Sequence, residues 1–102
     1  MTQNASERPA RATREAFGAT LVELAQQGVD VVAVDADLAG STTTKKLGAL
    51  DADRLVDVGI AEQDMVGVAA GLSLAGRIAF TASFAVFGTG RCYDQIRNTV
   101  CY

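Results

Sequence analysis

A short run of β-branched residues constrains the fold of this chain more than any other feature. Residues 29–35 read VDVVAVD, and residues 31–34 are apolar at every position. A strand with one face in water alternates apolar and polar residues, whereas a continuous apolar run is typical of a strand buried inside a parallel sheet. Parallel strands need long crossover connections, which are usually helices. The run therefore predicts an α/β domain with a mainly parallel sheet and flanking helices.

Helical spacing precedes this strand and also follows it. Phe17, Leu21 and Leu24 recur three and four residues apart, and Gly28 follows where a helix would end. Gly76 is placed in the same way after a second helical pattern. The full set of predicted elements is helices over 10–27, 60–75 and 89–98, strands over 29–35, 54–58 and 77–83, a polar loop over 36–46 and a disordered leader over 1–9.

The predicted sheet is narrow for this architecture. The chain has 102 residues, which is enough for one small domain with one modest core. Residues 99–102 form an apolar run that is typical of the approach to another strand. We therefore interpret residues 10–102 as part of a larger domain, and a compact three-stranded domain is the alternative.

Composition excludes several classes of function. The chain has no histidine, which excludes a serine–histidine triad and most zinc sites within it. The formal net charge is −3, with no clustered basic face for nucleic acid. No apolar run has the length of a membrane span or of a signal peptide, so a cytoplasmic location is expected. Cys92 and Cys101 match no metal motif and are interpreted as inert buried thiols.

Three polar or aromatic segments follow the predicted strands, where ligands bind in open parallel sheets. Glu62 lies in the first turn of the second long helix, where an acidic side chain ordinarily stabilises the helix dipole. That helix is apolar over most of its surface, so its start is expected to be buried and the carboxyl desolvated. Phe84 and Phe87 follow the last strand and are either core residues or an aromatic wall for a flat heterocycle.

Weaker signals lie in the first loop and the first helix. Ser41 follows Gly40 and begins a run of hydroxyl side chains, which can donate to a phosphate but are more often simply solvated. No glycine-rich phosphate fingerprint accompanies them. Arg14, taken alone, is an ordinary surface charge. These residues by themselves predict an α/β domain with a carboxylate and an aromatic pocket, and no more.

The amino-acid sequences of these segments resemble the pyrimidine-binding domain of transketolase and its thiamine-diphosphate-dependent relatives. The match begins at residue 11, continues to residue 102 and keeps the family's order of motifs. The motifs are TREAFG at 13–18, DADLAGST at 35–42, DVGIAEQ at 57–63, AAGLS at 69–73, SFAVF at 83–87 and DQIRN at 94–98. The resemblance is strongest to the split form, in which this half is a separate C-terminal-section polypeptide.

The resemblance implies a role for the segment that contains Glu62. Glu62 matches the glutamate that bonds N1′ of the cofactor's aminopyrimidine and so promotes activation of thiamine diphosphate. Phe87 matches the aromatic residue that stacks on the pyrimidine, and Phe84 is expected to line the same pocket. Asp37 matches an acidic residue close to the cofactor. The chain would thus contribute to a transfer of two-carbon ketol units between sugar phosphates in the pentose phosphate pathway.

The resemblance also implies what other chains supply. Arg14 and Ser41 match positions that hold the phosphate of the sugar substrate. The family's diphosphate-and-metal motif is absent, so Mg²⁺ and diphosphate are expected on a diphosphate-binding (N-terminal section) subunit, and no metal ligand is expected here. The site would form at an interface in a dimeric or heterotetrameric assembly containing a second copy of this chain.

Two alternatives stay open. Another thiamine-diphosphate enzyme with the same glutamate block is one, either deoxyxylulose-phosphate synthase or the β-chain of a 2-oxoacid dehydrogenase. The other is a non-catalytic remnant that packs against a partner without turning substrate over.

Overall fold

Three parallel strands form the centre of the molecule. The computed structural model describes residues 10–102, and its strands are β1 (Val31–Asp35), β2 (Leu55–Asp57) and β3 (Ile78–Ala82). Their order in the sheet is β2-β1-β3, so β1 is the central strand. The register aligns Asp35 with Asp57 on one side and with Ala82 on the other, so all three strands end at one edge. The predicted α/β class with a parallel sheet is confirmed.

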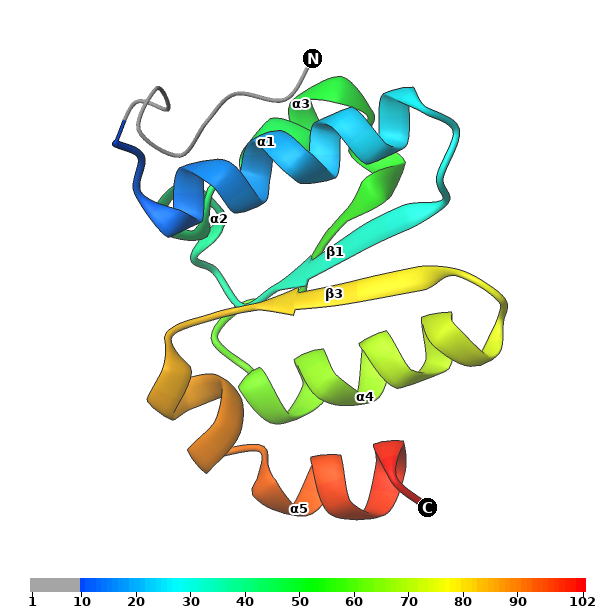
Figure 1. Cartoon of the computed structure of the whole chain (residues 1–102). Coiled ribbons are helices and arrows are strands. Elements are labelled where there is room, and N and C mark those ends of the chain that lie inside the picture. The colour runs from blue at the N-terminus through cyan, green and yellow to red at the C-terminus, as the bar shows by residue number, and fades with distance from the viewer. Residues whose placement is uncertain (1–9) are drawn as a thin grey trace.

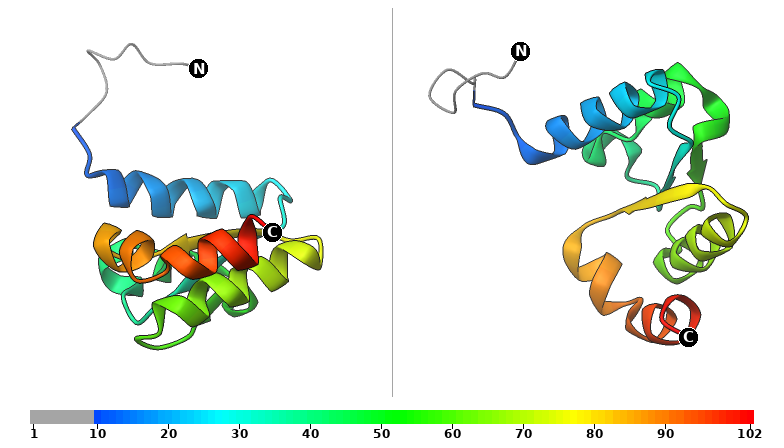
Figure 2. Two further views of the ribbon diagram at one scale, coloured as in Figure 1. Left: turned by 90° about the horizontal axis from the view of Figure 1, so that it is seen from below. Right: turned by 45° about the vertical axis from the view of Figure 1, so that its right-hand side comes forward.

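Helices cover both faces of the sheet (Figure 1). One face carries α1 (Thr13–Gln26), α2 (Ala39–Thr42) and α3 (Lys45–Leu50), and the other carries α4 (Glu62–Leu74). A short 3₁₀ turn, Ala52–Arg54, precedes β2. The chain ends in a helical region next to α4, made of π-helical turns at Val86–Gly90 and Ile96–Val100 around α5 (Tyr93–Gln95). The right-hand view in Figure 2 shows this region on the α4 side of the sheet, away from α1.

Strand β1 separates two apolar clusters, which explains its continuous apolar sequence. Val31 and Ala33 pack with Leu21 of α1 and Leu47 of α3 on one face. On the other face, Val34 packs in a cluster with side chains from α4. All five residues of β1 are buried. Burial of apolar area on both faces supplies most of the stability of such a strand, at roughly 25 cal/mol per Å².

Two predicted helix ends are confirmed by the backbone. Gly28 follows α1 with φ of 88°, and Gly76 follows α4 with φ of 95°. Such left-handed conformations disfavour any side chain with a Cβ atom, so glycine is suited to both positions. Leu21 is buried, and Phe17 and Leu24 pack against its cluster, as the spacing predicted.

A third glycine lets α1 approach the segment that follows β1. A Cβ atom at Gly18 would lie 2.7 Å from the carbonyl oxygen of Thr43 and would also collide with its side chain. The Thr43 hydroxyl donates a hydrogen bond to the carbonyl oxygen of Arg14. This close contact fixes the start of α1 against residues 41–44.

The structure corrects two predicted segments. Residues 36–46 were expected to be a loop, but they contain all of α2 and the start of α3. The last helix was expected over 89–98, yet helical geometry extends to Val100, so residues 99–100 do not approach a further strand. The other elements lie within one to three residues of their predicted ends. The predicted leader, residues 1–9, lies outside the described residues.

Candidate functional site

The carboxylate of Asp35, the last residue of β1, organises the segment that follows. Asp35 is fully buried, and its Oδ2 accepts hydrogen bonds from the hydroxyls of Thr42, at 2.6 Å, and Thr44, at 2.9 Å. Its Oδ1 accepts from the backbone N–H of Leu38 at 2.6 Å. A buried carboxylate is tolerated only when such donors replace water. The hydroxyl run is therefore mainly structural, because two of its members bind this side chain.

A second aspartate performs the same task at the end of β2. Oδ1 of Asp57 accepts hydrogen bonds from the backbone N–H of Asp37, at 3.0 Å, and of Gly59, at 2.9 Å. Asp37 has φ of 63°, and its side chain is exposed. The structure thus joins the loops after β1 and β2 across the edge of the sheet. It places Asp37 at that edge through its backbone.

The predicted phosphate-binding residues lie in neighbouring segments. Arg14 is in the first turn of α1 and Ser41 is in α2, and both are exposed. The hydrogen bond from Thr43 to the Arg14 carbonyl connects these two elements. Both segments lie at the same end of the molecule as the start of α4 (Figure 1). A role in phosphate binding stays a prediction.

Glu62 is the first residue of α4 and is buried, as the sequence predicted. Only 5% of its side chain is exposed. Its charge has a partner that sequence reasoning missed: Nη1 of Arg91 donates to Oε1 of Glu62 at 2.7 Å. Arg91 is itself half exposed. The buried carboxylate is therefore satisfied from the segment after β3, not by a residue of its own helix.

The same arginine covers an aromatic ring. Its Cζ atom lies 4.0 Å from the centre of the Phe87 ring, which is a cation–π contact. Phe84 lies beside Phe87, with ring centres 5.7 Å apart and planes inclined by 35°. Gln63 Nε2 also donates to the carbonyl oxygen of Arg91 at 3.0 Å. Glu62 and Phe87, which come from separate segments, are thus brought together around Arg91. Phe84 adjoins Phe87 but does not border the opening at Glu62, so the structure does not show it lining the same pocket.

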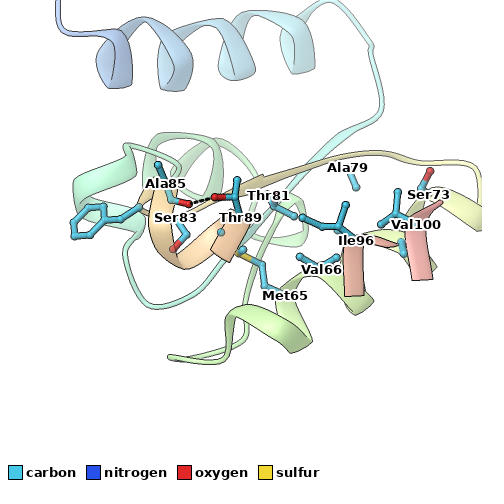
Figure 3. Close-up of a pocket in the computed structure, with 14 residues that line it drawn as sticks. Met65, Val66, Ser73, Ala79, Thr81, Ser83, Ala85, Thr89, Ile96 and Val100 are labelled. Atoms are coloured by element: carbon cyan, nitrogen blue, oxygen red, sulfur yellow. Dashed lines mark hydrogen bonds between the residues drawn. The ribbon is translucent and has the colours of Figure 1, made fainter. Parts of the chain in front are cut away.

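Two openings flank this cluster. The smaller, of about 410 Å³, is bordered by residues 60–64 and Arg91, so the Glu62–Arg91 pair lies at its wall. The larger, of about 480 Å³, lies between β3, α4 and the C-terminal helical region (Figure 3). Met65, Val66 and Ile96 give it an apolar lining, and Phe84 also borders it. Of these two openings, the smaller is lined by charged side chains and the larger is not.

Cys92 is buried next to the ion pair. Its Sγ lies 3.5 Å from the carbonyl oxygen of Phe87. Burial raises the pKa of the Cys92 thiol, the charge of Glu62 raises it further, and the charge of Arg91 lowers it. Because only the thiolate is a strong nucleophile, a raised pKa makes the Cys92 thiol less reactive. This agrees with the interpretation of Cys92 as an inert buried thiol. The same interpretation of Cys101 was wrong about burial, because Cys101 follows the last helical turn and is exposed.

Alkylation is expected to distinguish the two cysteines. Iodoacetamide at about pH 8 should label the exposed Cys101 and leave Cys92 unmodified, because a raised pKa keeps Cys92 protonated. Peptide mass spectrometry after a timed reaction measures both sites. Labelling of both at full rate should follow denaturation, which serves as the control. Equal rates in the folded protein would contradict the buried position of Cys92.

In residues 10–102, no group of three or more histidine, cysteine or acidic side chains is placed to hold a metal ion. No helix in the same range is long and apolar enough to cross a membrane.

Comparisons with known proteins agree with the geometry. Residues 9–102 match the family model described as "Transketolase, pyrimidine binding domain". The chain is 44% identical over 89 residues to a putative transketolase C-terminal section from Methanocaldococcus jannaschii, covering 87% of this chain and 28% of that protein. It is also 44% identical over 89 residues to a 1-deoxy-D-xylulose-5-phosphate synthase from Lachnoclostridium phytofermentans, covering 85% of this chain and 14% of that protein.

A solved structure is similar as well. It is described as a split gene transketolase, inactive beta4 tetramer, and superposes with a TM-score of 0.78 at 48% sequence identity. The match covers 89% of this chain and 30% of the other. The chain therefore spans less than a third of the length of these relatives.

Proposed function

This chain belongs to the transketolase pyrimidine-binding domain family, and from that premise we propose that it holds the aminopyrimidine ring of thiamine diphosphate in a transketolase. One observation carries the proposal: the buried carboxylate of Glu62 borders an opening of about 410 Å³ and lies in one cluster with the ring of Phe87. A carboxylate and an aromatic ring together suit a flat, protonatable heterocycle.

The residues present fit the pyrimidine end of the cofactor. Bound thiamine diphosphate supplies the electron sink for breaking and forming carbon–carbon bonds beside a carbonyl group. Glu62 would exchange a proton with the ring nitrogen N1′, and its burial keeps water from competing for that proton. Phe87 and Phe84 would contact the ring, and Asp37 would approach the cofactor from the end of β1. Arg14 and Ser41 would bind the phosphate of a sugar substrate.

The rest of the site would come from a partner. We propose that a diphosphate-binding N-terminal-section subunit holds Mg²⁺ and the diphosphate, in a dimeric or heterotetrameric assembly that includes a second copy of this chain. The similar protein named a C-terminal section and the split-gene tetramer support this arrangement. The substrates would be sugar phosphates of the pentose phosphate pathway, in the cytoplasm.

A second candidate is 1-deoxy-D-xylulose-5-phosphate synthesis. The observation that favours it is the 44% identity to such a synthase, which equals the identity to the transketolase C-terminal section. Both reactions would use Glu62 in the same way, so the pyrimidine half of the site does not separate them.

An activity assay on the assembled protein tests the proposal. The chain, assembled with its diphosphate-binding subunit and supplied with thiamine diphosphate and Mg²⁺, should transfer a two-carbon unit from a ketose phosphate to an aldose phosphate. Removal of the cofactor by chelation and dialysis should abolish transfer, and its return should restore it. Formation of 1-deoxy-D-xylulose 5-phosphate instead would select the second candidate. Cofactor binding without either product would favour the non-catalytic remnant.

A further inference from the structure

Arg91 contacts both groups that the proposed cofactor site needs. Its Nη1 atom lies 2.7 Å from Oε1 of Glu62, and its guanidinium carbon lies 4.0 Å from the centre of the Phe87 ring. Glu62 lies in α4, whose start borders the smaller opening, and Phe87 lies in the π-helical turn after β3, so one side chain connects these two elements. Arginine suits this position because its planar guanidinium donates in a fixed direction and stacks on a ring at the same time.

The backbone around Arg91 is also held in place. The side chain of Gln63, the residue next to Glu62, donates a hydrogen bond to the Arg91 carbonyl oxygen at 3.0 Å. Cys92, the next residue, is fully buried and contacts the carbonyl oxygen of Phe87 at 3.5 Å. These contacts fix the start of the Arg91 side chain against the first turn of α4.

The pairing leaves one carboxylate oxygen available. Within residues 10–102, the hydrogen bond and the ion pair of the Glu62 carboxylate both involve Oε1. A carboxylate has two oxygens, and the smaller opening is lined by Glu62 itself. If Oε1 is held by Arg91, the carboxyl group has one orientation, and Oε2 is the atom that remains for a ligand.

We propose that Arg91 is a positioning residue for Glu62: it binds Oε1, so that Oε2 is presented to a ring nitrogen of the cofactor, and it fixes the Phe87 ring beside that atom. This inference rests on the proposed function, because it assigns Arg91 a task only if Glu62 exchanges a proton with the cofactor. Arg91 acts through Glu62 and Phe87 and takes no proton itself.

Loss of the guanidinium is expected to affect turnover more than substrate binding. In the assembled holoenzyme, Arg91→Met should lower kcat by about 10²-fold, since a misplacement of about 1 Å is enough for such a loss. The KM for the sugar phosphate should change by less than about threefold, because Arg91 is assigned no contact with the substrate. Arg91→Lys keeps the charge and should recover part of kcat. Arg97→Met, which removes an exposed arginine from the same C-terminal helical region, is the matched control and should behave as the unmodified protein.

Cofactor affinity supplies a readout that does not depend on turnover. Isothermal titration of the cofactor-free assembly with thiamine diphosphate and Mg²⁺ should give a Kd about tenfold higher for Arg91→Met than for Arg97→Met. An unchanged Kd together with an unchanged kcat would overturn the inference. A tenfold weaker Kd that Arg91→Lys partly restores would support it.

A double variant separates this inference from the proposed function. If Arg91 acts mainly through Glu62, Arg91→Met should cause a much smaller loss of kcat in a Glu62→Gln background than in the unmodified protein, because only its contact with Phe87 is then lost. Equal losses in both backgrounds would show that Arg91 acts independently and would overturn the inference. If Glu62→Gln abolishes turnover and Arg91→Met does not change it, only the positioning role fails. If neither substitution changes turnover, the proposed function fails as well.

Discussion

Replacement of Glu62 by glutamine should reduce turnover of the assembled enzyme by about 10²- to 10⁴-fold. This is the usual contribution of a side chain that transfers a proton in the transition state. Glutamine has nearly the same shape and its carbonyl oxygen can still accept the hydrogen bond from Arg91. It cannot exchange a proton with a ring nitrogen at neutral pH. The expected result is therefore a folded and assembled protein with very low kcat.

The matched control tests the ordinary role of an acidic residue at a helix start. Glu15 occupies the first turn of α1 and is exposed, so Glu15→Gln removes the same charge from an equivalent place in another helix. Steady-state kinetics should show a change of less than about threefold for Glu15→Gln, because an exposed dipole interaction contributes only about 0.3–1 kcal/mol. Full activity in Glu62→Gln would refute the assignment of Glu62 as the proton-transferring residue.

The Asp35→Ala substitution should cause the largest loss of stability. Three donors converge on this fully buried carboxylate: two threonine hydroxyls and the Leu38 N–H. Alanine would remove three hydrogen bonds to a charged acceptor, each worth about 1.5–3 kcal/mol. The Leu38 N–H would lose its acceptor, whereas the Thr42 hydroxyl could still donate to the Leu38 carbonyl oxygen and the Thr44 hydroxyl to Thr42. We expect the free energy of unfolding to fall by about 3 kcal/mol or more. Denaturant titration of the cofactor-free protein, followed by circular dichroism, measures this change.

Two further variants separate burial from hydrogen bonding as the cause. Asp35→Asn keeps the shape and one acceptor oxygen, so the free energy of unfolding should fall by about half as much as in Asp35→Ala. Asp57→Ala also removes an acceptor of two backbone N–H groups, but Asp57 is exposed and water can replace it. The free energy of unfolding of Asp57→Ala should fall by less than about 1 kcal/mol. Similar unfolding curves for Asp35→Ala and Asp57→Ala would show that the buried network around Asp35 adds little.

The strands and long helices could be predicted because their signals are local. The apolar run of β1 reflects burial on both faces, and the glycines after α1 and α4 reflect left-handed backbone conformations. The short helices α2 and α3 were missed because the residues that join them are held by a buried side chain at the end of β1. Hydroxyl side chains are poor helix formers, and here Thr42 and Thr44 bind the buried Asp35.

The site was predictable in part for the same reason. The apolar character of α4 indicated that Glu62 would be buried, which the structure confirms. The pairing with Arg91 was missed because 29 residues separate the two, and only the fold brings the segment after β3 to the start of α4. The signal available in the sequence was the presence of an arginine close after the two phenylalanines, without any indication of its partner.

The strand order has a consequence for how the chain is made. A ribosome releases the central strand, β1, before either of its neighbours exists. The edge that faces β3 stays open until residues 78–82 have emerged, after all of α4. During that interval, a five-residue strand that is apolar at four positions and has unpaired backbone groups is exposed to other nascent chains. Slow translation between β2 and β3 would lengthen this exposure, so synthesis of this stretch without pauses favours a soluble product.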